Sequence, residues 1–284
     1  MRVKFSNFLA GFILLFSLSG MATAESVKIG WTAWSDAEFV TNVAARDIEQ
    51  RLGQNVELIQ THIAPQYQGL AAGDIDVMLM AWLPGTDEDY MDKVGTDIVS
   101  LGILYGYARL DWAVPSYIPE DQLSSIEDLK KDEVRSKLDR TMTGIDPGAG
   151  LTRLSQQVLE DYELDGHELQ ISSGAGMTAA LARAVRRDDW IVVTGWSPHW
   201  KFGAYDLRYL KNTLGSFERV HAMARQGFYQ DNPEAALMIS RMHFDLDALQ
   251  ESMFYAQENS YEEAVDRFIE QNGDLIDYWV CGKL

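Results

Sequence analysis

The chain has 284 residues and a formal net charge of −19, and hydrophobic residues make up 46% of it. A charge this negative argues against nucleic acid and anionic membranes as partners; it favours cationic ligands or, equally well, an acidic surface adapted to salt. A single cysteine, Cys281, excludes an internal disulfide framework. The length is sufficient for two lobes rather than one hydrophobic core.

The first 24 residues have the pattern of a secretory signal peptide. Arg2 and Lys4 provide a positive start, the apolar run FLAGFILLFSLSG follows, and small residues end at Ala24. No cysteine follows the apolar run, which argues against a lipid anchor. No later segment approaches the roughly 18 uninterrupted apolar residues of a spanning helix. We therefore expect cleavage near Ala24, a periplasmic mature protein and no direct insertion into a membrane.

The mature chain opens with strands that alternate with helices. Apolar runs and turn residues predict strands and helices in the order 26–34, 35–52, 55–60, 65–73 and 74–82. The first helix can be capped by Ser35 or Asp36 and stops at Gly53. This alternation is typical of a parallel sheet that helices cover on both faces.

The pattern changes at residues 105–119, an extended stretch with two prolines that we interpret as a crossover into a second lobe. Residues 190–196 predict a buried strand of that lobe, and 218–228 predict the return crossing. The C-terminal part predicts helices. The expected organisation is therefore a signal peptide at 1–24, lobe 1 at 25–111, lobe 2 at 112–218, and a return to lobe 1 at 219–284.

Three tryptophans stand at or just after the C-terminal end of a predicted strand: Trp34, Trp82 and Trp196. Open α/β sheets bind ligands beyond the carboxyl ends of their strands. Two of the three belong to the first lobe and one to the second, so a closed cleft would bring them face to face. Aromatic faces attract a quaternary ammonium, each by roughly 0.5–2 kcal/mol. Spacing alone leaves open whether the three form such a cage or belong to the core.

The remaining tryptophans are less informative. We expect Trp279, on the last predicted helix, and Trp190, at the start of the strand that Trp196 ends, to lie in the core. Trp112 lies in the crossover, where cleft and core are equally compatible with the pattern.

The segment GIDPGAGLTRL, residues 144–154, predicts a strand, a glycine turn and a helix start. Free N–H groups and the helix dipole make such a start an anion site. The segment lacks the third glycine of a dinucleotide fingerprint and the Gly-Lys-Ser/Thr of a phosphate loop, so a small carboxylate fits better than a nucleotide. Asp36, Asp87 and Asp146 lie beside the proposed cleft, either as partners of a cation or as caps and turn formers.

Catalysis has little support in the sequence. The five histidines, at 62, 167, 199, 221 and 243, lack metal-site spacing, and no nucleophile elbow is present. We therefore expect a binding protein with no cofactor and no metal. A secreted hydrolase of small polar substrates and a signalling receptor subunit remain as alternatives.

The motifs GDIDVMLMAWLP, GIDPGAG and GWSPHWKFGAYDLRYL, in this order behind a signal peptide, resemble the glycine betaine-type substrate-binding proteins of ABC importers. The resemblance covers essentially the whole mature chain. It implies an α/β, two-lobed periplasmic-binding-protein fold (type II-like), with each lobe a mainly parallel sheet flanked by helices and the ligand in the cleft. It also implies a cage of Trp34, Trp82 and Trp196 around a trimethylammonium group, with the N–H groups of Gly150 and Leu151 on a ligand carboxylate.

The same resemblance implies a function. A monomeric receptor would deliver glycine betaine or proline betaine to an ABC permease and its ATPase, with choline, carnitine or a sulfonium analogue as competing ligands. Asp36, two residues after Trp34, resembles the acid that choline-binding relatives place near their ligand.

One departure from the family pattern concerns Asp87. Betaine binders often carry a histidine a few residues past Trp-Leu-Pro, where this chain has Gly85-Thr86-Asp87. An ionised aspartate that points inward would repel a ligand carboxylate. We expect Asp87 to point to solvent, because residues 86–89 have the pattern of a solvated helix start.

Overall fold

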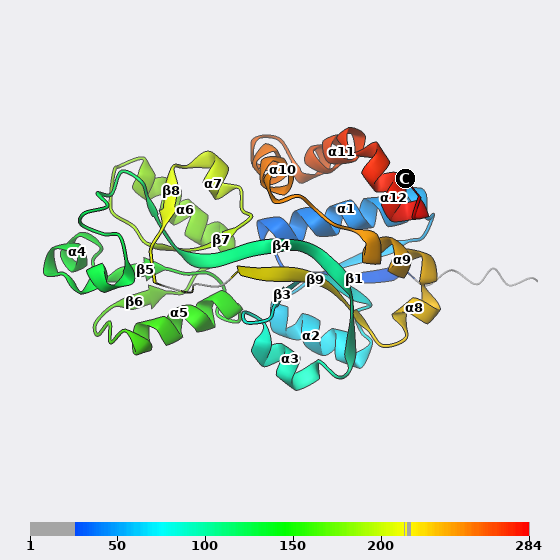
Figure 1. The fold of residues 1–284 in the computed structure, drawn as a ribbon, viewed down its shortest axis with the longest axis horizontal. Helices are drawn as coiled ribbons and strands as arrows, with labels where there is room; N and C mark the ends of the chain where they lie inside the picture. The colour runs from blue at the N-terminus through cyan, green and yellow to red at the C-terminus, as the bar shows by residue number, and fades with distance from the viewer. Residues whose placement is uncertain (1–25, 213, 215–216, 284) are drawn as a thin grey trace, which may run out of the picture.

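The computed structural model describes residues 26–212, 214 and 217–283. The predicted signal peptide lies outside these residues. The chain forms two lobes joined by two long strands, β4 (Ile98–Pro115) and β9 (Phe217–Arg225), which cross the middle of the molecule (Figure 1). Within the described residues no helix is long and apolar enough to span a bilayer.

The strands of the described chain belong to one nine-stranded sheet with the order β2-β1-β3-β9-β4-β7-β5-β6, and β8 pairs with β4. Their bounds are β1 Val27–Trp31, β2 Val56–Gln60, β3 Val77–Leu83, β4 Ile98–Pro115, β5 Thr141–Thr143, β6 Glu168–Gln170, β7 Val193–Ser197, β8 Leu207–Tyr209 and β9 Phe217–Arg225. β1 pairs in parallel with β2 and β3, and β5 with β6 and β7. The sheet is therefore parallel in the outer part of each lobe, as predicted, and β4 and β9 add antiparallel pairs between them.

The crossing strands pair with each other over most of the length of β9. β4 has 18 residues and pairs with β9 from Ile98 to Arg109, then with β7 from Arg109 to Ala113. One continuous strand thus contributes to both lobes. The division that we predict at 111/112 and 218/219 falls inside β4 and β9, and it stays a prediction.

Helices cover both faces of the sheet. Those of the first lobe are α1 Ser35–Arg51, α2 Ile63–Ala72, α3 Glu88–Val94, α8 Phe228–Asp231, α9 Pro233–Arg241, α10 Leu246–Glu258, α11 Tyr261–Gln271 and α12 Gly273–Cys281. The return of the C-terminal helices to the first lobe is visible in Figure 1. Trp279 of α12 is fully buried beside Phe244, with ring centroids 5.1 Å apart. Its predicted place in the core is confirmed.

The second lobe carries η1 Ile126–Lys130, α4 Asp132–Lys137, α5 Gly150–Asp161, α6 Gly174–Val185 and α7 Lys201–Ala204. Trp112 is fully buried in this lobe, and its Nε1 donates to Ser155 Oγ at 2.8 Å, so it is a core residue. Trp190 is only half-buried, and Lys137 Nζ lies 4.2 Å from its ring centroid. The expectation that Trp190 starts the strand is wrong, because β7 begins three residues later, at Val193. Trp190 nevertheless packs against the buried core of this lobe.

Candidate ligand-binding site

One cavity lies where the carboxyl ends of β1, β3 and β7 approach the start of α5. Its walls are Trp34, Trp82, Thr86, Asp87, Leu110, Ile145, Ala149, Gly150, Leu151 and Trp196. The structure therefore brings the three strand-end tryptophans and the glycine turn to one place. The cavity volume is about 20 Å³, little more than one water molecule requires. Entry of a larger solute requires the lobes to move apart.

Trp82 is held by a loop that returns to it. β3 is buried as far as Trp82, which is 4% exposed, and the chain then turns through residues 83–87. The N–H of Asp87 donates to the carbonyl of Trp82 at 3.0 Å, and the N–H of Trp82 donates to Asp87 Oδ2 at 2.9 Å. This reciprocal pair explains why acidic residues follow the strand so closely. One of them fixes the backbone that carries the indole.

The other two tryptophans are held across the cleft. Trp34 Nε1 donates to Asp146 Oδ2 at 2.8 Å, and Trp196 Nε1 donates to Asp36 Oδ1 at 3.0 Å. In each pair the indole comes from one lobe and the carboxylate from the other. The centroids of the two rings lie 6.5 Å apart at an interplanar angle of 59°. Asp36 and Asp146 thus orient the rings, and neither is among the residues that line the cavity.

Asp36 has a second partner behind the site. Its Oδ2 accepts a hydrogen bond from Tyr105 OH at 2.7 Å, so both carboxylate oxygens are engaged. Burial raises the pKa of Asp36, and the hydrogen bonds from Tyr105 and Trp196 oppose that increase. Tyr105 also packs edge-on against Trp82, with ring centroids 6.4 Å apart. Asp36 and Tyr105 therefore connect two of the three tryptophans.

The start of α5 offers two free donors. Gly150 and Leu151 are the first residues of this 12-residue helix, and in the described part of the chain their N–H groups meet no acceptor. Both residues line the cavity. The N-terminal end of a helix dipole and two unpaired amides form an arrangement that can bind a carboxylate.

Asp87 lies inside the lobe, and the expectation that it points to solvent is wrong. It is 3% exposed, and its Oδ2 also accepts from Tyr67 OH at 3.1 Å. Burial raises its pKa to about 7. The expectation failed because α3 begins only at Glu88. Glu88 and Asp89 are exposed at the helix start, whereas Asp87 turns inward to bind the backbone of Trp82.

Further contacts between the lobes surround the cavity. Arg153 of α5 donates to the carbonyls of Gly85 and Thr86 at 3.2 and 3.3 Å, and its Nε lies 3.2 Å from Asp89 Oδ2. Tyr90 OH donates to the carbonyl of Gly148 at 2.7 Å. The two lobes therefore meet directly around the proposed site.

Sequence reasoning missed several residues of this site. Thr86, Leu110, Ile145 and Ala149 line the cavity, and Glu218 supports it, because the N–H of Thr86 donates to Glu218 Oε1 at 3.0 Å. Thr86 and Ala149 directly precede the predicted site residues Asp87 and Gly150, so their place in the site could have been predicted from the sequence. Glu218 is 132 positions from Thr86 and carries no local signal.

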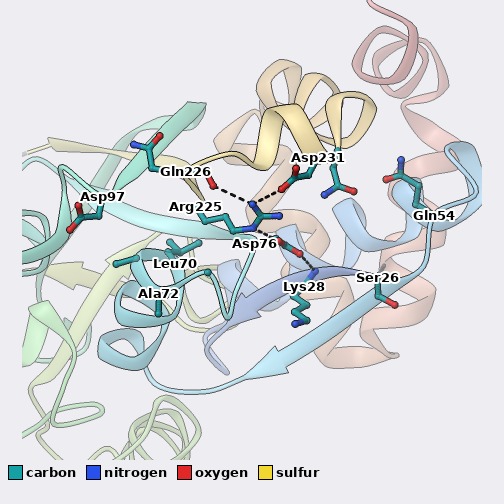
Figure 2. A pocket seen from close by; sticks show the side chains of 13 residues that line it. Ser26, Lys28, Gln54, Leu70, Ala72, Asp76, Asp97, Arg225, Gln226 and Asp231 are labelled. Carbon is teal, nitrogen blue, oxygen red and sulfur yellow. Dashed lines mark hydrogen bonds and ion pairs between the residues drawn. The ribbon is translucent and has the colours of Figure 1, made fainter. Parts of the chain in front are cut away.

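A larger hollow of about 780 Å³ lies at the opposite, amino end of β1 (Figure 2). Arg225 pairs there with Asp76 at 2.6 Å and with Asp231 at 2.7 Å, and the backbone N–H of Lys28 donates to Asp76 at 2.8 Å. The guanidinium of Arg225 is thus already paired with the carboxylates of Asp76 and Asp231. No aromatic side chain lines the hollow. It is therefore a poorer candidate for the binding site than the tryptophan-lined cavity. No group of three or more metal-ligating side chains was found within the described ranges.

Two lobes, two crossing strands and a cavity between the lobes define the class of two-lobed solute-binding proteins. Residues 25–271 match the family described as the substrate binding domain of ABC-type glycine betaine transport systems. The chain belongs to that family. The family consists of binding domains of transport systems, in agreement with the prediction that the protein is not an enzyme.

Individual relatives agree with this assignment. A glycine betaine/carnitine transport binding protein of Listeria monocytogenes is 37% identical over 161 residues, or 55% of this chain and 53% of the relative. This match therefore spans about half the length of that relative. The crystal structure of lactococcal OpuAC, closed and complexed with glycine betaine, has a TM-score of 0.82 and 32% identity over 90% of this chain and 99% of its own. A choline binding protein of an ABC transporter, in complex with choline, has a TM-score of 0.81 and 26% identity, covering 90% of this chain and 92% of its own.

Proposed function

We propose that this protein is the solute receptor of an ABC importer and binds a zwitterionic quaternary ammonium compound, glycine betaine or proline betaine. The observation that carries the proposal is the convergence of Trp34, Trp82 and Trp196 on one cavity that also contains two free backbone amides. The two features match the two ends of a betaine.

The ammonium end has no N–H and cannot be held by hydrogen bonds. The faces of three indoles attract it by cation–π interaction, each by roughly 0.5–2 kcal/mol and more when water is excluded. The carboxylate end would then lie at the N–H groups of Gly150 and Leu151, where the dipole of α5 also favours negative charge.

The fold and the predicted leader sequence support a role in delivery. Residues 1–24 would direct the protein to the periplasm, and closure of residues 25–111 and 219–284 against 112–218 would enclose the solute. The closed form would present both lobes to an ABC permease, which its ATPase drives. The receptor would act as a monomer, without a metal or cofactor.

Isothermal titration calorimetry against glycine betaine, proline betaine, choline and carnitine tests the proposal. We expect a betaine to bind more tightly than choline, because choline offers only a hydroxyl to the amides of Gly150 and Leu151. A choline affinity above that of every betaine would reject the carboxylate assignment. Absence of binding by all four compounds would reject the quaternary ammonium site itself.

Choline is the second candidate, and one observation favours it. A buried acid, Asp87, lines the cavity, and an ionised carboxylate there attracts a ligand that is only a cation. A similar solved structure, that of an ABC-transporter choline binding protein, is a complex with choline. The protonation state of Asp87 therefore separates the two candidates.

A further inference from the structure

The two oxygens of the Asp87 carboxyl group have unequal surroundings. Oδ2 accepts two hydrogen bonds, from the N–H of Trp82 at 2.9 Å and from Tyr67 OH at 3.1 Å. Oδ1 has no hydrogen-bond partner among residues 26–212, 214 and 217–283. Since Asp87 forms part of the cavity wall together with Gly150 and Leu151, its unpartnered oxygen is the one available to a ligand.

Several titratable or charged groups face Asp87 from the elements packed around it, namely Tyr67 of α2, Tyr90 of α3, Arg153 of α5 and Glu218 of β9. Burial beside Asp87 raises the pKa of Tyr67, so Tyr67 stays a donor. Arg153 is the one positive group in this set, and its hydrogen bonds and ion pair go to Gly85, Thr86 and Asp89. Asp87 therefore has no direct cationic partner among the described residues.

Burial is the largest cause that raises the pKa of Asp87 to about 7, and the nearby Glu218 carboxylate contributes in the same direction. A ligand carboxylate at the start of α5 would add another negative charge and raise that pKa further. The bound ionised form would combine two unfavourable features, a buried charge and a like-charge neighbour. The neutral acid avoids both.

We propose that Asp87 binds a betaine as the neutral acid, with the proton on Oδ1, so that it donates a hydrogen bond to the ligand carboxylate beside the N–H groups of Gly150 and Leu151. Capture then takes up one proton from solvent when Asp87 is ionised beforehand, and release of the betaine returns it. Asp87 would be a specificity-determining residue that changes its ligand preference with pH. The inference rests on the proposed function, since it requires a betaine in this cavity.

The pH dependence should differ in sign between the two ligand types. Because burial raises the pKa of Asp87 to about 7, betaine affinity should be nearly constant below pH 6 and fall by up to about tenfold per pH unit above pH 7. We expect a loss of about tenfold to thirtyfold from pH 6 to pH 8.5. Choline affinity should rise over the same range, because an ionised Asp87 attracts a cation that has no acid group.

The experiment is calorimetric titration of the mature protein with glycine betaine and with choline from pH 5.5 to 8.5. Repeating the betaine titration at pH 8 in buffers of different ionisation enthalpy counts the protons taken up, for which we expect about one. Asp87→Asn keeps a donor in place and cannot titrate. It should make betaine affinity independent of pH from 5.5 to 8.5.

Three variants identify the titrating group. Asp89→Asn changes an exposed acid two positions away and should retain the wild-type pH dependence. Glu218→Gln and His62→Gln change two further side chains near the cleft. His62→Gln should retain the wild-type pH dependence, and in Glu218→Gln the dependence should persist but move to lower pH, because the Glu218 carboxylate contributes to the raised pKa of Asp87. His62 is relevant because its Nδ1 lies 3.9 Å from Asp146.

The outcomes are distinct. Betaine affinity that does not change with pH in the wild type overturns the inference, as does a pH dependence that persists in Asp87→Asn or disappears in Glu218→Gln or His62→Gln. Binding of choline with no binding of betaine also overturns it. If neither compound binds at any pH, the proposed function fails, and the inference fails with it for that separate reason.

Discussion

The carboxylate of Asp36 and the indole of Trp196 are 160 positions apart in the sequence and are joined by a hydrogen bond of 3.0 Å. Asp36 belongs to α1 of the first lobe and Trp196 to β7 of the second, so this bond exists only when the lobes approach each other. The other oxygen of Asp36 accepts from Tyr105 at 2.7 Å. Asp36 is therefore well placed to couple closure of the lobes to the orientation of a proposed cage residue.

Asp36→Ala should weaken betaine binding tenfold or more, because it leaves the N–H of Trp196 and the hydroxyl of Tyr105 without an acceptor in a buried place. Each unsatisfied group costs about 1–3 kcal/mol, and about 1.4 kcal/mol corresponds to a tenfold change. Asp36→Asn retains one acceptor oxygen and should lose less affinity. Calorimetry measures both variants, and equal affinity of Asp36→Ala and wild type would show that Asp36 does not act through Trp196.

Trp82→Ala and Trp196→Ala should each reduce the affinity for a quaternary ammonium by about tenfold or more, because the ligand has no hydrogen bond to replace a lost cation–π contact. Trp279→Ala is the matched control, because Trp279 is a fully buried tryptophan in the core of the first lobe. Its loss should lower the free energy of unfolding by about 3–5 kcal/mol and leave the affinity of the folded protein unchanged. Unchanged affinity in both Trp82→Ala and Trp196→Ala would remove the cage from the proposal.

The positions of the three tryptophans could be anticipated because a general rule of sheet geometry applies to them. Open α/β sheets bind ligands beyond the carboxyl ends of their strands, and the sequence marks the end of a strand by the change from apolar to turn residues. β1 and β3 of the first lobe are parallel, whereas β7 of the second lobe runs antiparallel to them, so its carboxyl end faces theirs across the cleft. Trp34, Trp82 and Trp196 all stand at such changes, and the structure brings them to one cavity. Their role toward a ligand stays a proposal.

The orientation of Asp87 and the partners of Asp36 could not be anticipated in the same way. Four polar residues in a row have the composition of an exposed helix start, but the structure buries Asp87 through a hydrogen bond to Trp82 within a tight loop. Local composition does not encode that direction. The Asp36–Trp196 bond depends on how two lobes meet, which neither periodicity nor turn chemistry describes.

A pH dependence of stability is expected from Asp47, which lies on α1 away from the cavity. It is 1% exposed, its Oδ2 has no hydrogen-bond partner within the described chain, and burial raises its pKa from 3.8 to about 6. The folded state therefore holds this proton more tightly than the unfolded state. As a result, the contribution of Asp47 to the free energy of unfolding is fully present below pH 4 and is lost as the pH rises through 6.

Asp47→Asn should consequently raise the free energy of unfolding at pH 8 by about 1–3 kcal/mol, given about 1.4 kcal/mol per unit of pKa difference. It should have little effect at pH 4. Urea unfolding at both pH values measures this, with Glu49→Gln as the control, since Glu49 is an exposed acid on the same helix. Equal effects of Asp47→Asn at pH 4 and pH 8 would indicate that Asp47 does not titrate between them.

Gly150→Ala tests whether binding of a betaine requires the close contact between Gly150 of the second lobe and Thr86 of the first lobe. A Cβ at Gly150 would overlap the carbonyl oxygen of Thr86 and lie 2.6 Å from its Cγ2, so the two lobes would have to stay further apart. Alanine suits the first turn of a helix, and the second lobe itself should fold normally. We expect betaine affinity to fall by tenfold or more while the thermal unfolding midpoint without ligand changes by less than about 2 °C.

Gly148→Ala is the matched control for this substitution, because a Cβ at Gly148 would meet only the Tyr90 hydroxyl, at an ordinary 3.8 Å. It should bind betaine within about threefold of wild type. Small-angle X-ray scattering adds a readout of closure: wild type and Gly148→Ala should become more compact when saturated with betaine, and Gly150→Ala should not. If Gly150→Ala compacts and binds like wild type, the approach of Gly150 to Thr86 is not required for binding, and the ligand must be held in a more open cleft than the one described.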